Sequence, residues 1–163
     1  MPVSLYRIDD RLIHGQVVVG WGQPLDLGFI VLVDDVVAES EWEQELYRLG
    51  VPPSMEVYFV STADAAREIA RYTADRRTGM ILTGSVETML TLARTAVRPV
   101  TAVNVGGIHH REDRTQKLRY VFLNEVEEQE LREMANLGVV VTAQDVPSAT
   151  AHSLEALLRG CST

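Results

Sequence analysis

A short charged stretch near the amino terminus holds the residues best suited to chemistry. Residues 7–17 read Arg-Ile-Asp-Asp-Arg-Leu-Ile-His-Gly-Gln-Val and place two arginines, two aspartates and a histidine between two apolar segments. A neutral imidazole nitrogen is a competent nucleophile toward phosphorus, and the phosphoramidate that results is a good phosphoryl donor. An arginine beside it can bind phosphoryl oxygens through its forked guanidinium. The stretch therefore predicts a histidine that holds a phosphoryl group or another anion.

We predict His14, Arg11 and Asp9 as the catalytic residues. His14 would accept the group, although by itself it would also suit a polar corner residue hydrogen-bonded to an aspartate. Arg11 lies three residues earlier, and its alternative role is a salt bridge to Asp9 or Asp10. One aspartate would orient the imidazole or the arginine, and the alternative for each is an Asx-turn or a helix cap.

Three further residues form the predicted phosphate-binding set. Arg7, at the end of a strand, is a second cation for which a structural role is preferred over a catalytic one. Gly15 would let the backbone bend without a Cβ clash and leave the imidazole uncovered. Gly15 and Gln16 could also offer backbone N–H groups at the start of the first helix, with simple turn chemistry as the alternative.

The sequence predicts strands that alternate with helices, and these elements must position the charged stretch. Such alternation predicts a largely parallel sheet, and parallel strands all end on one edge, where binding crevices form. The fold class is therefore α/β: a single three-layer domain over residues 1–163, with a mostly parallel sheet of about seven strands and helices on both faces. The expected strands span residues 3–8, 28–33, 55–60, 79–82, 100–105, 119–123 and 139–142. Helices are expected over 16–21 and after the caps Ser40, Ser61 or Thr62, Ser85, Asn124 and Ser148.

The charged stretch resembles a known family. Its eleven residues are similar to the active-site signature of the IIB component of the mannose/fructose/sorbose class of sugar phosphotransferase systems (PTS), and further echoes lie at residues 33–35, 103–107 and 141–147. The resemblance implies a seven-stranded sheet with the first strand in the centre. It also implies a phosphocarrier that accepts a phosphoryl group on His14 from a phosphorylated IIA protein and passes it to a sugar bound by a membrane IIC/IID complex.

The implied enzyme is a protein-N(pi)-phosphohistidine–sugar phosphotransferase, of which this chain would be the IIB component. We expect no cofactor, because an arginine and backbone amides can neutralise the phosphoryl oxygens without a metal ion. The adjacent His109 and His110 are interpreted as part of a solvated loop and not as metal ligands, since no spaced partner accompanies them. Trp21 and Trp42 are interpreted as packing residues.

The composition of the chain indicates which kinds of partner and which cellular compartment to expect. Fifteen basic residues against twenty-three acidic ones give a formal net charge of −8, which argues against nucleic acid or an anionic membrane surface as the main partner. The single cysteine, Cys161, has no partner for an internal disulfide, as expected in a reducing compartment. No apolar run approaches the roughly 20 residues that span a bilayer. We therefore expect a cytoplasmic protein, and the sequence leaves self-association open.

Two other functions would require the same charged stretch, residues 7–17. One is a regulatory phosphoacceptor without a transport role, and the other is a small-anion-binding domain without turnover. The sequence does not identify the sugar, nor does it assign roles to Asp34 and Asp35. Ser85 is interpreted as an ordinary helix cap, with an anion-binding turn at residues 83–85 as the alternative. Residues 108–117 are predicted to form a mobile surface loop.

Overall fold

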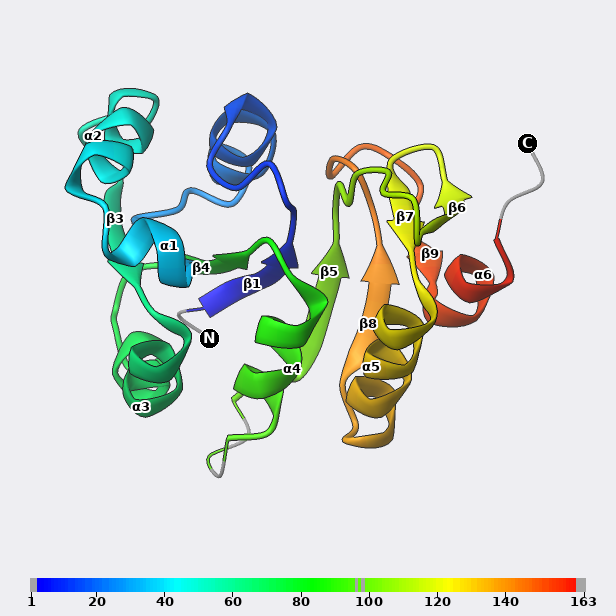
Figure 1. The fold of residues 1–163 in the computed structure, drawn as a ribbon. Coiled ribbons are helices and arrows are strands. Elements are labelled where there is room, and N and C mark those ends of the chain that lie inside the picture. Colours follow the sequence, from blue (N-terminus) through cyan, green and yellow to red (C-terminus); the bar gives the residue numbers. More distant parts are fainter. Residues whose placement is uncertain (1–2, 96, 98, 161–163) are drawn as a thin grey trace.

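The first strand occupies the centre of a seven-stranded sheet. The computed structural model describes residues 3–160 except 96 and 98, so Cys161 lies outside it. The strand order is β3-β2-β4-β1-β5-β8-β9, and the pairs are parallel apart from β8 with β9. The predicted fold class and the central first strand are thus confirmed (Figure 1). The strands are β1 (Val3–Ile8), β2 (Phe29–Val33), β3 (Glu56–Val60), β4 (Gly79–Thr83), β5 (Ala102–Val105), β8 (Val140–Ala143) and β9 (His152–Ser153).

Helices cover both faces of the sheet because the inner strands are apolar on both sides. In β2, Val31 belongs to one core cluster, whereas Ile30 and Leu32 belong to the other. Helices α3, α4, α5 and α6 contribute buried residues to the first cluster, and η1 and α1 to the second. The helices are η1 (Gln16–Gly22), α1 (Asp35–Ala38), α2 (Glu41–Leu49), α3 (Thr62–Thr73), α4 (Val86–Ala93), α5 (Glu125–Asn136) and α6 (Leu154–Arg159). The longest have 12 residues, and no helix in the described part of the chain could cross a bilayer.

Most of the predicted helix starts are confirmed by side-chain caps. Ser40, Ser61 and Ser85 each accept a hydrogen bond from the backbone N–H three residues later, and Asn124 forms a full capping box. The prediction that the last helix begins after Ser148 is wrong, because α6 begins after Ser153, which caps it. The residues before it, including Ser148, lead into β9, whose pairing with β8 delays the helix.

The first helix differs in type from the prediction. Gln16–Gly22 is a π-helix, whose wider turns are rare and are often found at functional sites. Trp21 is buried in this helix, in agreement with the packing role predicted for it.

The polar segment at residues 108–117 is better anchored than predicted. Ile108 is buried, and strand β6 (Thr115–Leu118) pairs antiparallel with β7 (Val121–Leu123) in a separate two-stranded sheet. The expected sixth strand is therefore not part of the main sheet. Arg114 also forms a nearly buried ion pair with Glu127 of α5, at 2.6 Å. Most of the other residues between 108 and 117 are exposed, as expected for a surface loop, and the mobility of the segment stays a prediction.

Candidate active site

The loop from Asp9 to Gly15, which we call the active loop, joins β1 to η1 and is hydrogen-bonded to the strands on both sides. The Asp9 N–H donates to the Thr83 carbonyl at the end of β4, at 2.9 Å. The Asp10 N–H donates to the Gly107 carbonyl just beyond β5, at 2.8 Å. The carboxyl ends of three adjacent parallel strands thus hold the loop, as expected for a binding site on this edge.

The sharp bend in this loop lies at Leu12 and not at Gly15. Leu12 has a φ of 60°, in the left-handed region, where a non-glycine residue costs about 1–2 kcal/mol. Gly15 has a φ of −53°, which any residue adopts, so the predicted need for glycine in the bend is wrong. A Cβ at Gly15 would nevertheless meet nothing within 4 Å. The space above the start of η1 is therefore open to a partner.

Asp9 is the centre of the site. Its buried carboxylate accepts hydrogen bonds from Arg11 Nε at 3.0 Å, from Arg11 Nη2 at 2.9 Å and from Arg7 Nη2 at 3.2 Å. Burial alone would raise the pKa of Asp9, but the hydrogen bonds from Arg11 and the nearby positive charges hold the pKa below its usual value. Asp9 is therefore an ionised anchor for two arginines.

Arg7 is fully buried and serves as a structural tie. Its guanidinium donates to the Asn104 side chain and to the carbonyls of Gln144 at 3.0 Å and Asp145 at 2.9 Å. The group also lies over the Trp21 ring, 4.9 Å from its centroid. Burial lowers the pKa of Arg7, although arginine remains charged at neutral pH. In this conformation Arg7 has no exposed surface for a phosphoryl group, contrary to its predicted place in the phosphate-binding set.

Arg11 is the cation that remains accessible. Its side chain is 30% exposed, and the hydrogen bonds to Asp9 raise its pKa. Nε and Nη2 bind Asp9, while Nη1 has no hydrogen-bond partner among the described residues. The structure thus combines the two roles weighed for Arg11, because the salt bridge leaves part of the guanidinium free for an anion.

His14 lies above the same carboxylate. Its Nδ1 is 2.7 Å from the Leu12 carbonyl oxygen, to which Nδ1 donates its proton. Nε2 is buried without a partner among the described residues, 3.9 Å from Asp9 Oδ2. Neither ring nitrogen is open to a donor in this rotamer. A phosphoryl group can reach the ring only after it turns about its side-chain bonds.

The remaining predicted phosphate-binding residues lie at the start of η1. Gly15 is exposed and Gln16 is half-buried, with its Oε1 atom unpartnered among the described residues. Their backbone N–H groups begin the π-helix, and their contact with phosphate stays a prediction. Within the described residues, no group of three His, Cys, Asp or Glu side chains is placed to hold a metal ion.

Sequence reasoning missed two glycines that pack against the arginines. A Cβ built on Gly106 would meet the Arg7 guanidinium and would lie 2.7 Å from Asp9 Oδ2. A Cβ on Gly107 would lie 3.0 Å from Arg11 Nε. Both residues follow β5 and belong to the stretch 103–107 that resembles the family, where no role was assigned to them. Their lack of side chains is what allows the ion pairs to form.

The Gly106→Ala variant should therefore be less stable than wild type, although Gly106 is far from residues 7–17 in the sequence. The added methyl has no space, so we expect unfolding free energy to fall by about 1–3 kcal/mol. Gly15→Ala is the matched control and should change stability by no more than about 0.5 kcal/mol. Urea unfolding of both variants measures the difference. Equal stabilities would show that the loop rearranges freely around Arg7.

The Asp9→Asn variant should be less stable than wild type by an amount that depends on pH. Because the pKa of Asp9 is lowered on folding, its ionised form adds stability above the unfolded value of about 3.9. That contribution is lost as the pH falls through the folded pKa. At pH 7 the variant should be less stable by about 3 kcal/mol, since Arg7 stays buried without its counter-charge. Urea unfolding should show this gap narrowing below about pH 4; a constant gap would contradict the ion-pair account.

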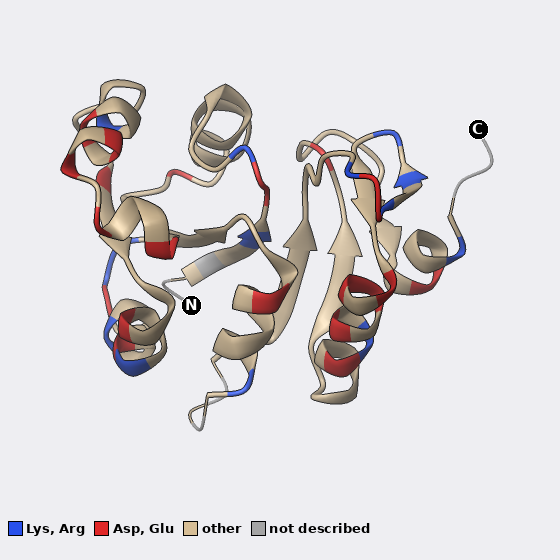
Figure 2. Cartoon of the chain, viewed as in Figure 1, with Lys and Arg blue, Asp and Glu red and all other residues tan. Residues whose placement is uncertain are grey.

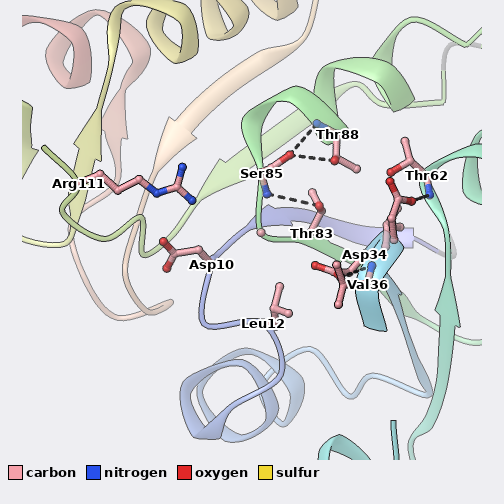
Figure 3. A pocket seen from close by; sticks show the side chains of 12 residues that line it. Asp10, Leu12, Asp34, Val36, Thr62, Thr83, Ser85, Thr88 and Arg111 are labelled. Atoms are coloured by element: carbon pink, nitrogen blue, oxygen red, sulfur yellow. Dashed lines mark hydrogen bonds between the residues drawn. The ribbon is translucent and has the colours of Figure 1, made fainter. Parts of the chain in front are cut away.

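A pocket of about 360 Å³ opens beside the loop (Figure 3). Asp10 and Leu12 line one side, and residues 83–85 line another. Ser85 caps α4 by accepting from the Thr88 N–H at 2.9 Å, which supports the cap interpretation.

The acidic residues at this pocket also have structural partners. Asp34 accepts from the N–H groups of Val36 and Val37 and so caps α1, and Asp35 accepts from the Thr62 N–H at 2.7 Å. Asp10 accepts from the His109 N–H at 2.8 Å and also contacts the His109 ring. His109 is therefore tied to the active loop, while its side chain remains 67% exposed, as expected for a solvated loop.

Comparison with known proteins agrees with this geometry. The family described as PTS system sorbose subfamily IIB component matches residues 3–162. The PTS system sorbose-specific EIIB component of Klebsiella pneumoniae is 32% identical over 148 residues, which cover 91% of this chain and 90% of that protein. An N-acetylgalactosamine-specific phosphotransferase enzyme IIB component 2 of Escherichia coli (strain K12) is 31% identical, covering 97% of this chain and all of that protein.

Solved structures show the same fold. The crystal structure of the IIBSor domain of the sorbose permease from Klebsiella pneumoniae superposes with a TM-score of 0.88 at 30% identity, and both chains are fully covered. The PTS system N-acetylgalactosamine-specific IIB component 1 from Escherichia coli gives a TM-score of 0.86 at 28% identity, covering 93% of this chain and 98% of that chain. The resemblance of residues 7–17 is thus confirmed over nearly the whole sequence. This chain belongs to the sorbose subfamily of PTS IIB components, within the mannose/fructose/sorbose family.

Proposed function

We propose that this IIB component carries a phosphoryl group on His14, which it receives from a phosphorylated IIA protein and passes to a sugar held by membrane IIC/IID subunits. The observation that carries the proposal is the convergence of His14 and Arg11 on one buried carboxylate oxygen, Oδ2 of Asp9. The imidazole and a partly free guanidinium thus lie side by side before the ring turns to react. We propose that the transfer takes place on the cytoplasmic side of the membrane.

The chemistry consists of two displacements at phosphorus. In the first, the N–P bond of the donor histidine breaks as a new N–P bond forms to a ring nitrogen of His14. In the second, that bond breaks, an O–P bond forms to a sugar hydroxyl, and the hydroxyl proton is released. Both steps need in-line approach and neutralisation of the equatorial oxygens more than they need an acid or a base. Arg11 and the N–H groups at Gly15 and Gln16 would supply that neutralisation.

The His14 ring must rotate before either displacement, because one of its nitrogens is hydrogen-bonded and the other is buried. The hydrogen bond between Nδ1 and the Leu12 carbonyl must be released if Nδ1 is to become an acceptor, and Nε2 must leave its buried position if it is to react. The loss of one such hydrogen bond costs about 1 kcal/mol, which a docking partner can supply. We infer that donor binding and exposure of the ring are coupled.

The named relatives support the partners but do not single out the sugar. Proteins named as specific for sorbose, fructose and N-acetylgalactosamine all match this chain. A PTS system mannose-specific EIIAB component of Escherichia coli is 30% identical over 149 residues, and the match covers 45% of that longer protein. Its name combines IIA with IIB, which supports a IIA protein as the phosphoryl donor here.

A two-step transfer assay tests the proposal. The protein is incubated with ³²P-labelled IIA, and the labelled residue is mapped by mass spectrometry. The labelled protein is then mixed with membranes that contain the IIC/IID subunits and with each of the sugars for which relatives are named. We expect label on His14 and then on one sugar. Label that reaches His14 but no sugar would favour the regulatory phosphoacceptor, and absence of label would reject both functions.

A further inference from the structure

Helix α2 turns its apolar side toward solvent. Trp42, Leu46 and Leu49 are 72%, 49% and 84% exposed, and none of the nine residues of α2 is fully buried. Positions separated by four and three residues share one face of an α-helix. These three residues, which we call the α2 apolar face, therefore form one stripe. The packing role expected for Trp42 is wrong within the isolated chain.

The rotation of α2 is fixed by polar contacts on its inner side. Gln44 Nε2 donates to the carbonyls of Val37 at 3.0 Å and Ala38 at 3.2 Å, at the end of α1. Tyr47, also on the inner side, packs against Phe59, with ring centroids 6.4 Å apart. Turning the α2 apolar face inward would break these contacts, including both hydrogen bonds of Gln44. The outward orientation of the stripe is thus specified by the structure itself.

The α2 apolar face is near the edge that carries the active loop. Helix α1 precedes it, and Val36 of α1 is itself largely exposed. Val36 lines the same pocket as Leu12 of the active loop (Figure 3). Because α2 binds α1 through Gln44, exposed apolar side chains occur from the rim of the active loop outward to α2. Helix α1 thus connects the pocket beside the active loop to α2.

Charge distinguishes the candidate occupants of this surface. Helix α2 carries mostly acidic charge, coloured red in Figure 2. Glu41, Glu43 and Glu45 form what we call the acidic rim of the α2 apolar face, and the one basic residue of the helix, Arg48, is paired with Glu45 at 3.3 Å. A second copy docked symmetrically would bring acidic rim against acidic rim. Anionic lipid headgroups would be repelled as well. The cytoplasmic loops of membrane proteins, in contrast, are rich in lysine and arginine.

We propose that the α2 apolar face is the docking surface for the membrane sugar-permease subunits, on an apolar patch rimmed by lysine and arginine at their cytoplasmic side. The inference rests on the proposed function, because those subunits hold the sugar that receives the phosphoryl group. Trp42 is the expected anchor, since buried tryptophans dominate interface energetics. The acidic rim steers the encounter and makes it sensitive to salt.

The double variant Trp42→Gln/Leu46→Gln tests this surface, with Val126→Gln as the matched control. Val126 is equally exposed, at 66%, but lies on α5, which covers the other face of the sheet. None of the three side chains is buried, so all the proteins should unfold at similar urea concentrations. Labelling of His14 by ³²P-IIA should stay within about twofold of wild type in both. Transfer from His14 to sugar in IIC/IID membranes should show an apparent KM raised about tenfold or more in the double variant alone, with kcat unchanged.

Each other outcome overturns the docking proposal. An equal loss in the labelling step would assign the surface to the IIA donor. Unchanged KM in both steps would leave the α2 apolar face without a role in transfer. A wild-type dimer that the double variant abolishes, measured by sedimentation, would assign the face to self-association. If wild-type protein itself fails to pass label to sugar, the proposed function fails first, and that result is separate because it does not depend on the variants.

Discussion

His14→Ala should accept no phosphoryl group from a phosphorylated IIA donor. The variant removes the one imidazole that shares a carboxylate with Arg11, and alanine offers no nucleophile in its place. The fold should survive, because the described contacts of the ring are a hydrogen bond to the Leu12 carbonyl and the distant approach to Asp9. Loss of that hydrogen bond should lower the unfolding free energy by about 1 kcal/mol. Incorporation of ³²P, measured beside urea unfolding, separates loss of chemistry from loss of structure.

The other three histidines provide the matched controls. His109 is held by Asp10, the His110 ring packs edge-on against Phe122, and His152 belongs to β9. Single alanine variants at these positions should retain full labelling of His14. Label that persists in His14→Ala, or that maps to any of the three, would contradict the assignment of the acceptor.

Arg11→Lys should transfer phosphoryl groups at least about a hundredfold more slowly than wild type, although it keeps the positive charge. The guanidinium holds Asp9 through Nε and Nη2 and still has Nη1 for the anion. A lysine ammonium is a point charge without this planar fork, so it cannot bind carboxylate and phosphoryl group in the same geometry. Removal of one such transition-state contact costs on the order of a hundredfold or more in rate.

Stability provides the second measurement on this variant. In Arg11→Lys a positive charge remains beside the buried Asp9, which Arg7 also pairs, so the variant should lose only roughly 1 kcal/mol of stability. Rates of transfer to and from His14 are compared with thermal midpoints for wild type and Arg11→Lys. A variant that transfers within a few-fold of wild type but melts earlier would make Arg11 structural. The mechanism would then lose its main cation.

Local features of this chain could be predicted from the sequence. His14, Arg11 and Asp9 lie within six consecutive residues, so a single loop brings them together whatever the rest of the fold does. Asn124 was identifiable as a helix cap because its partner Glu127 is three residues away. The parallel sheet followed from alternating elements, since few arrangements accommodate them.

The features that could not be predicted depend on distant parts of the chain. Nothing near Arg7 indicates that it is buried, because Asn104 and the carbonyl of Asp145 belong to other strand ends. Gly106 is needed only because that arginine lies beside it. The exposed side of α2 was also hidden, since Gln44 sets its rotation through carbonyls of another helix. Such roles follow from strand order and packing, which periodicity does not encode.

The burial of Arg7 has a consequence for how the protein is made. Its bonds to Asn104, Gln144 and Asp145 join positions 97, 137 and 138 residues apart, and contacts of such separation form late in folding. At about 5–20 residues per second, the ribosome takes roughly 7–28 s to proceed from Arg7 to Asp145. During that interval Arg7 lacks these distant partners, although residues 7–17 have already been synthesised. We therefore expect the loop that carries the signature to reach its final geometry, and the chain its full activity as a phosphoryl acceptor, only when β8 joins the sheet.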